Sequence, residues 1–252
     1  MRCVVLMPVY RAATFFNTVA SELYRLDPQP EIYVFAENNS PDRTLELVSH
    51  FKRKKEIIRL WFRNDAMKYC QTRYDLIGIV RQTLLQRARQ LDPDYAIFLD
   101  ADIRVMSRDF IEELTSWPEA DIVGGKYLRE YPQGRMLACL FKSGDPEKQF
   151  QLRVYPKTTD QLEEIAAMSG GCLRLSRKVL QDRRINFYPV KRDWAGDVSE
   201  DYGYCLEAGL HGYRCWLDNV VELQHWVTQH HIDGKAWKVN ELNEPIPFCY
   251  GV

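Results

Sequence analysis

The first hundred residues alternate short apolar runs with amphipathic segments, and this alternation narrows the fold more than any other feature. The apolar runs are rich in Val, Ile, Phe and Tyr and occupy residues 3–7, 32–36, 57–62 and 95–99. Three of the four are nearly continuous in apolar character, as strands covered on both faces by helices must be. Strands that alternate with helices form right-handed βαβ units and a parallel sheet. We therefore predict an α/β fold with a mostly parallel central sheet flanked by helices.

Two segments between these runs carry helix signals. Residues 41–54 follow Ser40, a residue type favoured at the N-cap, and Pro41 would take the first helical position, where its missing N–H costs nothing. Residues 76–91 place apolar side chains at steps of three and four, with Arg and Gln on the opposite side. Both segments are predicted to cover the sheet as helices.

The second half of the chain is less regular. We expect, in chain order, a strand near 121–124, hairpin-like strands and loops over 127–159, a short helix at 160–167, a loop, strand and helix over 169–180, a helix near 198–211, strands near 213–217 and 220–224, and a tail over 226–252. The sequence contains no internal repeat, low-complexity tract or linker. The chain is therefore expected to form a single domain over residues 1–252.

Charge and cysteine content exclude several classes of protein. The 252 residues include 34 basic and 35 acidic side chains, and a net charge of −1 argues against binding nucleic acid or anionic lipid through bulk charge. No apolar run approaches the roughly 18 residues of a spanning helix, so we expect no transmembrane anchor. The seven cysteines are scattered and form no Cys-x-x-Cys pair. This usage is typical of a reduced cytoplasmic protein with buried thiols and no zinc site.

The tract YAIFLDADIRV at residues 95–105 carries the pair of acidic residues that says most about chemistry. Asp100 and Asp102 follow a buried strand, and open α/β sheets bind their ligands at the carboxyl ends of strands. Residues two apart share a face, so both carboxylates point the same way while Ala101 points away from them. Two such charges need solvent or a bridging cation, and oxygen ligands suit Mg²⁺ or Mn²⁺. A solvated turn with Asp102 as a cap is the plainer alternative.

The same Asp-x-Asp pattern also resembles the nucleophile strand of the haloacid-dehalogenase phosphatases. That family places Thr or Val two residues after the second Asp, where this chain has Arg104. It also usually begins with this strand, which is the fourth strand predicted here. A phosphatase is therefore disfavoured.

Six segments resemble, in the same order, the motifs of the GT-A glycosyltransferases, most closely those of family 2. They are the opening strand and turn MPVY at 7–10, the second-strand acidic motif FAENNSPDRT at 35–44, the helix IVRQTLLQRA at 79–88, the Asp-x-Asp (DXD) motif FLDADI at 98–103, the glycine turn SGGCLRLSRKVL at 169–180, and the Glu-Asp motif SEDYGYCLEAGLHGYR at 199–214. The resemblance covers roughly residues 2–225. It implies a nucleotide-sugar-binding half over 1–105, an acceptor-side half over 106–225 with a smaller mixed sheet, and the tail over 226–252.

The resemblance also implies which residues bind the nucleotide-sugar donor. Glu37 would accept a hydrogen bond from the base, where the family more often has Asp. Asn39 stands at a turn glycine of the family, and Asn tolerates left-handed backbone. Arg81 would pair with the diphosphate or the base through its planar fork, although a solvated helix face competes with that role. The full donor set is Pro8, Val9, Tyr10, Glu37, Asn39, Arg81, Asp100, Ala101 and Asp102.

Three residues are implied as metal ligands for Mn²⁺ or Mg²⁺. Asp102 would bind the ion directly, while Asp100 would bind the ribose and reach the ion through water. His225, at the end of a predicted strand, matches the histidine that family members often supply. A structural histidine is an equal alternative for a lone His in such a place.

The Glu-Asp motif supplies the implied catalytic residues. Adjacent residues on a helix point about 100° apart, so Glu200 and Asp201 cannot serve one proton together. Asp197 fits an N-cap with Glu200 three places later, which leaves Asp201 as the general base toward an acceptor hydroxyl. In the plainer alternative, both acids only stabilise the N-terminus of the helix through its dipole. On the sugar side, Gly170 and Gly171 would allow close approach of a substrate. Trp194 would stack on a sugar ring, although a core aromatic is the commoner role for such a residue.

The expected activity is metal-dependent transfer of a sugar from a nucleotide-diphosphate sugar, UDP-linked as most often in the family, to an acceptor hydroxyl. Inversion follows if Asp201 lies opposite the leaving group, and retention is the alternative if it does not. The acceptor would be a glycan, a protein or a lipid-linked sugar reached from the cytoplasm. A sugar-nucleotide pyrophosphorylase would need a glycine-rich basic loop after the first strand, and MPVYRAATF has no glycine. A binding module without catalysis is disfavoured by the intact Asp100, Asp102 and Asp201.

Overall fold

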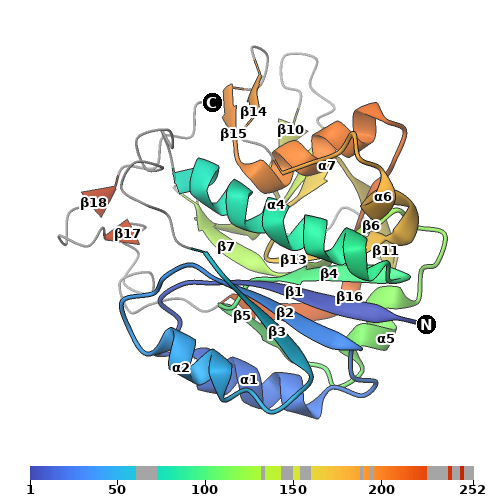
Figure 1. The fold of residues 1–252 in the computed structure, drawn as a ribbon. Coiled ribbons are helices and arrows are strands. Elements are labelled where there is room, and N and C mark those ends of the chain that lie inside the picture. Colours follow the sequence, from blue (N-terminus) through green and yellow to red (C-terminus); the bar gives the residue numbers. More distant parts are fainter. Residues whose placement is uncertain are drawn as a thin grey trace.

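One large sheet forms the centre of the molecule, with helices on both of its faces (Figure 1). The computed structural model describes residues 1–60, 73–131, 134–142, 150–153, 160–187, 190–192, 196–225, 238–239 and 245–246. In spatial order the sheet contains β11 (Leu162–Ile165), β16 (Cys215–His225), β6 (Ile122–Lys126), β13 (Cys172–Ser176), β4 (Tyr95–Leu99), β1 (Cys3–Val9), β2 (Ile32–Glu37) and β3 (Lys55–Arg59). A ninth strand, β5 (Ile103–Val105), pairs with β16 outside this order.

The first half of the chain forms the parallel part of this sheet, as the alternation of apolar runs predicted. Strands β3, β2, β1 and β4 are parallel neighbours, and β1 and β2 are buried along nearly their whole length. Beyond β4 the sheet becomes mixed, because β13 runs antiparallel to both β4 and β6 while β16 is parallel to β6. The predicted α/β class with a mostly parallel central sheet is therefore confirmed.

Six helices are described, three on each face of the sheet (Figure 1). On one face lie α4 (Arg73–Leu91), α6 (Arg177–Gln181) and α7 (Glu200–Leu210), and on the other lie α1 (Phe16–Arg25), α2 (Thr44–Ser49) and α5 (Phe110–Thr115). The remaining short strands are β7 (Leu128–Tyr131), β8 (Gly134–Leu137), β9 (Cys139–Lys142), β10 (Phe150–Gln151), β12 (Ala167–Met168), β14 (Val190–Arg192), β15 (Gly196–Val198), β17 (Lys238–Val239) and β18 (Pro245–Ile246). No helix among the described residues is both long and apolar enough to cross a membrane.

Some predicted elements were wrong in type or extent. The segment expected as a helix at 160–167 contains β11, whose residues pair antiparallel with β16. The two strands expected at 213–217 and 220–224 are one strand, β16, with an irregularity in its pairing between Asp218 and Glu222. The polar residues between the two apolar runs thus mark a shift in strand pairing rather than a strand end.

The helix expected over 41–54 is limited to α2. Ser40 is not its N-cap, because the Ser40 amide donates to Glu37 Oε1 at 2.6 Å and its hydroxyl accepts from the Arg11 amide at 3.2 Å. Ser40 and Glu37 therefore close the turn after β2, and the helix begins only at Thr44.

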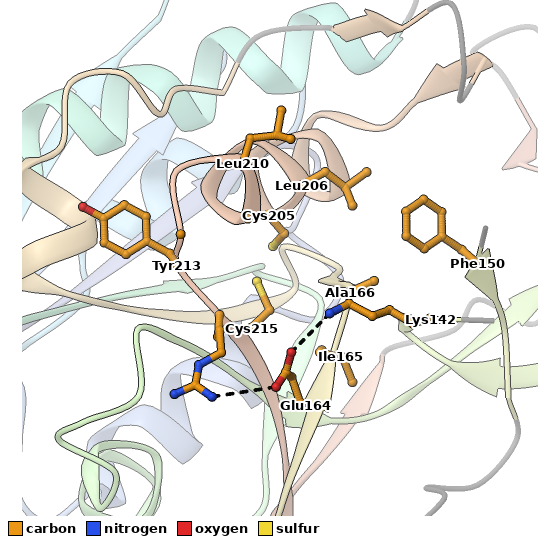
Figure 2. A pocket seen from close by; sticks show the side chains of 13 residues that line it. Lys142, Phe150, Glu164, Ile165, Ala166, Cys205, Leu206, Leu210, Tyr213 and Cys215 are labelled. Carbon is orange, nitrogen blue, oxygen red and sulfur yellow. Dashed lines mark hydrogen bonds and ion pairs between the residues drawn. The ribbon is translucent and has the colours of Figure 1, made fainter. Parts of the chain in front are cut away.

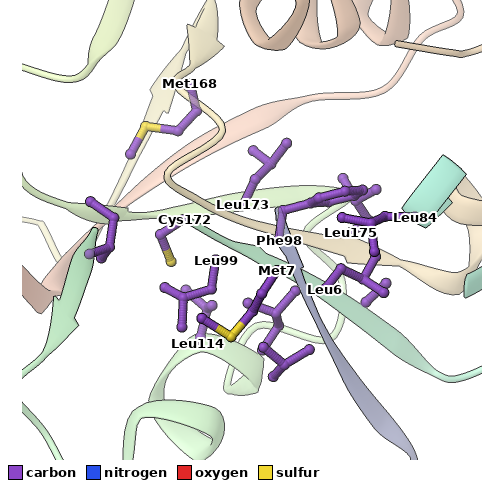
Figure 3. Close-up of a cluster of buried hydrophobic side chains, with 14 of the residues drawn as sticks. Leu6, Met7, Leu84, Phe98, Leu99, Leu114, Met168, Cys172, Leu173 and Leu175 are labelled. Atoms are coloured by element: carbon purple, nitrogen blue, oxygen red, sulfur yellow. The ribbon is translucent and has the colours of Figure 1, made fainter. Parts of the chain in front are cut away.

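The apolar core lies between the sheet and its helices and fixes the strands on which the site is built. Figure 3 shows side chains from β1, β4 and β13 packed with those of α4 and α5. The cluster includes Leu6, Met7, Leu84, Phe98, Leu99, Leu114, Met168, Cys172, Leu173 and Leu175. Because β1, β2 and β4 are parallel, their carboxyl ends meet at one edge of the sheet, and the loops that follow them lie together.

Candidate active site

The Asp-x-Asp turn follows β4 at the edge of the sheet where the parallel strands end. The start of β13 lies beside it. Cys172 of β13 pairs with Leu99 of β4, and the Asp100 amide donates to the Gly171 carbonyl at 3.0 Å. The Ile103 amide then donates to the Asp100 carbonyl at 3.0 Å and turns the chain into β5. The glycine motif and the Asp-x-Asp motif, seventy residues apart in sequence, therefore form one edge.

A buried arginine links the Asp-x-Asp turn to the Glu-Asp motif of α7. Arg81, on α4, has a side chain that is 2% exposed, and its Nη2 donates to both oxygens of Asp100 at 2.8 Å. Its Nη1 lies 3.6 Å from Glu200 Oε1 and 3.7 Å from Asp201 Oδ2. Burial lowers the pKa of the guanidinium, but the three carboxylates outweigh this effect and hold the pKa above its ordinary value. Arg81 is thus a permanent charge shared by three acids.

Two glycines make room for this arrangement. A Cβ atom on Gly170 would lie 1.2 Å from Arg81 Nη1, and one on Gly171 would lie 2.3 Å from the Tyr127 hydroxyl. Both positions therefore exclude any side chain while Arg81 and Tyr127 hold their places. These glycines were predicted to let a substrate come close to the backbone. The structure shows that the side chains of Arg81 and Tyr127 lie close to the two glycines.

Asp201, at the start of α7, accepts hydrogen bonds from four of the described residues. Its Oδ2 accepts from the Ser169 hydroxyl at 3.0 Å and the Gly170 amide at 2.8 Å. Its Oδ1 accepts from the Ser199 hydroxyl and from the Tyr202 amide at 2.8 Å. Only 6% of the Asp201 side chain is exposed. The position of this carboxylate is therefore fixed by the glycine turn and the helix start together.

Glu200 lies beside Asp201, and its carboxyl group is buried as well. Its side chain is 3% exposed, and Oε2 has no hydrogen-bond partner. Burial, followed by the negative charge of Asp201, raises the pKa of the Glu200 carboxyl from 4.5 to about 8. Glu200 is therefore largely protonated at neutral pH and cannot act as a base there, which separates the chemistry of the two adjacent acids.

The helix start itself differs from the predicted capping pattern. Ser199 rather than Asp197 occupies the N-cap of α7, and Asp197 belongs to β15. The strand β15 extends to residue 198, so only Ser199 lies between strand and helix. The predicted capping box between Asp197 and Glu200 was wrong.

Asp102 and His225 meet on the other side of the Asp-x-Asp turn. His225, the last residue of β16, pairs with Ile103 of β5, and its Nε2 lies 3.5 Å from Asp102 Oδ2. The Tyr127 ring stacks on the His225 imidazole with centroids 6.3 Å apart. A carboxylate oxygen and an imidazole nitrogen suit Mn²⁺, and Asp102 is 37% exposed. No group of three or more His, Cys, Asp and Glu side chains able to hold a metal ion occurs among the described residues.

The three predicted metal ligands are therefore brought to one turn, but they do not converge. The Asp100 carboxylate faces Arg81, whereas Asp102 faces His225. A cation between Asp102 and His225 would need further ligands from a bound substrate, as is usual for ions that serve phosphate groups.

The predicted donor residues of the first half lie at the same edge. Pro8 and Val9 end β1, and Tyr10, which follows, is 46% exposed. Asn39 has the left-handed backbone expected from its residue type, with φ of 44°. Glu37 is 1% exposed and accepts a hydrogen bond from the Ser40 amide, so it shapes the turn that follows β2. Ala101 is buried between the two aspartates, and Trp194 lies outside the described residues.

Three residues of the site were missed from the sequence. Ser199 directly precedes the Glu-Asp pair and Ser169 directly precedes the two glycines, so their positions in the motifs were a usable signal. Tyr127 carries no such signal, because only the tertiary fold brings it to His225 and Gly171.

A separate cavity of about 690 Å³ lies beside the C-terminal half of α7 (Figure 2). Leu206, Leu210, Phe150 and Ile165 supply apolar walls, and the two buried thiols of Cys205 and Cys215 also line it. At its edge Glu164 lies 3.3 Å from Lys142 and 3.9 Å from Arg214. None of the predicted site residues lines this cavity.

Comparisons with known proteins identify the fold. No protein-family model matches the chain, and no curated protein matches it in sequence. Among solved structures, Staphylococcus aureus TarS residues 1–349 in complex with UDP-GlcNAc has a TM-score of 0.60 at 16% identity and covers 95% of this chain and 62% of its own. The longer S. aureus TarS structure has a TM-score of 0.58 at 15% identity, over 93% of this chain and 38% of its own.

A mannosyltransferase gives a similar result. PcManGT from Pyrobaculum calidifontis, in complex with GDP-Man and Mn²⁺, has a TM-score of 0.56 at 16% identity over 90% of this chain and 57% of its own. The chain thus spans less than two thirds of the length of these structures. The fold is the GT-A fold of these glycosyltransferases, as the order of the sequence motifs predicted.

Proposed function

We propose that this chain is a metal-dependent glycosyltransferase that moves a sugar from a nucleotide-diphosphate sugar to an acceptor hydroxyl. One observation supports this proposal above all. The Asp-x-Asp turn lies at the same edge of the sheet as the buried Asp201 carboxylate at the start of α7. Arg81 lies between them, 2.8 Å from Asp100 and 3.7 Å from Asp201. Two structures of the same fold hold donors of this class, UDP-GlcNAc in one and GDP-Man with Mn²⁺ in the other.

Asp102 and His225 would hold the divalent ion, and Asp100 would bind the ribose while remaining paired with Arg81. When bound, Mn²⁺ or Mg²⁺ supplies charge neutralisation for the diphosphate leaving group. The donor set, one carboxylate and one imidazole 3.5 Å apart, fits an ion whose remaining ligands come from the diphosphate and water. The ion and the nucleotide are therefore expected to bind together.

Asp201 would act as the general base. Burial and the negative charge of Asp201 raise the pKa of Glu200 to about 8, which favours Asp201 over Glu200 as the base at neutral pH. It would take the proton of the acceptor hydroxyl as that oxygen attacks the anomeric carbon. Direct displacement from the face opposite the diphosphate inverts the configuration of that carbon.

The remaining proposed contacts with the donor and the acceptor follow from where each residue lies at the edge of the sheet that carries the Asp-x-Asp turn. Pro8, Val9, Tyr10, Glu37 and Asn39 would surround the base, for which we propose uridine, and Ala101 would lie beneath the ribose. Trp194 and the backbone of Gly170 and Gly171 would face the sugar and the acceptor, while Arg81 and Tyr127 fill the space beside the two glycine Cα atoms. We further propose a glycan, protein or lipid-linked acceptor and action in the cytoplasm.

A donor screen by hydrolysis tests this proposal. Release of UDP or GDP would be measured for a panel of UDP- and GDP-sugars, with and without Mn²⁺. We expect metal-dependent release from one donor, and a loss of at least about a hundredfold in Asp102→Ala and Asp201→Asn. Asp109→Ala, which changes an exposed acid at the start of α5, is the matched control and should keep full activity.

Two results would overturn the proposal. One is release that does not depend on metal and survives in Asp102→Ala. The other is synthesis of a nucleotide sugar from a nucleoside triphosphate and a sugar phosphate, which would establish a pyrophosphorylase instead.

A further inference from the structure

The Asp201 carboxylate has no vacant hydrogen-bonding position for an acceptor hydroxyl. A carboxylate offers about four lone-pair positions, two on each oxygen. The donors described above, Ser169 and Gly170 on Oδ2 and Ser199 and Tyr202 on Oδ1, fill all four. With 6% of its side chain exposed, Asp201 also offers little surface to a substrate. A proton must therefore reach it through one of the groups already bound to it.

The four donors differ in whether they can pass a proton on. Backbone amides donate but cannot also accept, so Gly170 and Tyr202 only hold the carboxylate. A hydroxyl can donate one hydrogen bond and accept another at the same time, which leaves the two serines. Ser169 is 3% exposed, whereas Ser199, which directly precedes α7, is partly exposed. Of these four donors, Ser199 is therefore the one that can relay a proton and is also partly exposed to solvent.

The Ser199 hydroxyl is also not used to cap the helix. An N-cap serine usually accepts a hydrogen bond from an amide of the first turn, but the Ser199 side chain makes no such bond. Instead it donates to Asp201 Oδ1, and its oxygen accepts no hydrogen bond from any residue that the structure describes. Its lone pairs are thus open to a hydroxyl that arrives from solvent.

We propose that Ser199 is a catalytic residue that relays the proton of the acceptor hydroxyl to Asp201; this inference rests on the proposed transferase function. The acceptor oxygen bonds to the anomeric carbon as the bond from that carbon to the diphosphate breaks, and the nucleoside diphosphate leaves with the electron pair. The acceptor proton passes to Ser199 Oγ while the Ser199 proton passes to Asp201 Oδ1. The serine ends as a hydroxyl and Asp201 ends protonated, to be deprotonated by water after product release.

The test compares two serines that donate to the same carboxylate. Hydrolysis of UDP- and GDP-sugars with Mn²⁺, in which water is the acceptor, is measured for Ser199→Ala, Ser199→Thr and the matched control Ser169→Ala. We expect Ser199→Ala to lower kcat by about a hundredfold with the donor KM unchanged, and Ser199→Thr to restore it to within a few fold. Ser169→Ala loses one positioning bond and should lower kcat by only about tenfold.

Solvent isotope effects separate a relay from a purely structural role. The dependence of kcat on the deuterium fraction of the solvent should be curved in wild type and in Ser169→Ala, because two protons move in one step. The same plot should be linear in Ser199→Ala, where one proton moves. Full activity of Ser199→Ala, or a linear plot for wild type, would overturn the relay while Asp201→Asn still tests the base. Absence of any wild-type turnover would overturn the relay and the transferase proposal together.

Discussion

Adding a single methyl group at Gly170 tests the buried charge cluster directly. In Gly170→Ala the new Cβ would lie 1.2 Å from Arg81 Nη1, 2.3 Å from its Cζ and 2.9 Å from its Nη2. An ordinary contact begins at 3.4 Å, so the end of the guanidinium must retreat by about 2 Å. It cannot do so and also keep both 2.8 Å bonds to Asp100. The substitution therefore separates Arg81 from its acids.

The expected cost follows from the burial of the cluster. Arg81 is 2% exposed, and breaking a buried ion pair typically costs about 3–5 kcal/mol. In a chain of this size that loss lowers the melting temperature by roughly 10 °C. Because the Gly170 amide also donates to Asp201, donor turnover should fall as well. The free energy of unfolding would be measured by urea denaturation, and turnover by nucleotide release.

A matched control and a compensating variant sharpen this experiment. A Cβ on Gly209 in α7 would meet nothing within 4 Å, so Gly209→Ala should be neutral or stabilise by about 0.5–1 kcal/mol. Arg81→Lys removes the forked end that the new methyl meets, so the double variant should lose less stability than the two single losses added together. A Gly170→Ala protein as stable and as active as wild type would refute the assignment of Arg81 as the centre of the site.

Three further predictions follow from other buried groups. Burial raises the pKa of Glu200 to about 8, so this carboxyl takes up a proton on folding between pH 4.5 and 8, and the free energy of unfolding falls as the pH rises through that window. Glu200→Gln should flatten this slope in urea denaturation measured from pH 5 to 9, and an unchanged slope would contradict the prediction. Arg174, fully buried in β13, donates to the carbonyls of Leu114, Trp117 and Ala120, so Arg174→Lys should lower the free energy of unfolding by about 3 kcal/mol, against less than 0.5 kcal/mol for the exposed Arg108→Lys. His225→Ala should weaken Mn²⁺ binding in the presence of UDP by roughly tenfold or more in a spin-resonance titration, and equal affinity would remove His225 from the metal site.

The parallel half of the fold was predictable because its elements are specified locally. Residues 95–99 were expected as a strand and form β4 with those bounds, since a short continuous apolar run between polar segments has few alternatives. The helix expected at 76–91 lies within α4. The second half depended on tertiary pairing instead. The sequence LEEI of β11 has no clear period, and only its pairing with β16 decides that it is a strand.

The site was predictable as a set of motifs but not as a set of contacts. Asp100, Gly170 and Asp201 were each identified from sequence, and the structure brings them together around Arg81. The saturation of Asp201 by four donors could not be predicted, because it depends on where β13 begins relative to α7. The fully buried position of Arg81 could not be predicted for the same kind of reason, since a helix pattern with Arg at that position is equally compatible with a solvated face and with a binding site.

The most direct test of the account is a crystal structure of this protein grown with Mn²⁺ and UDP, with the ion located by its anomalous scattering. The account predicts one manganese peak bonded to Asp102 and His225 at about 2.0–2.2 Å, also bonded to the diphosphate, with Arg81 still paired with Asp100. A manganese peak elsewhere, or a nucleotide bound in the cavity beside Leu206 and Leu210, would contradict it.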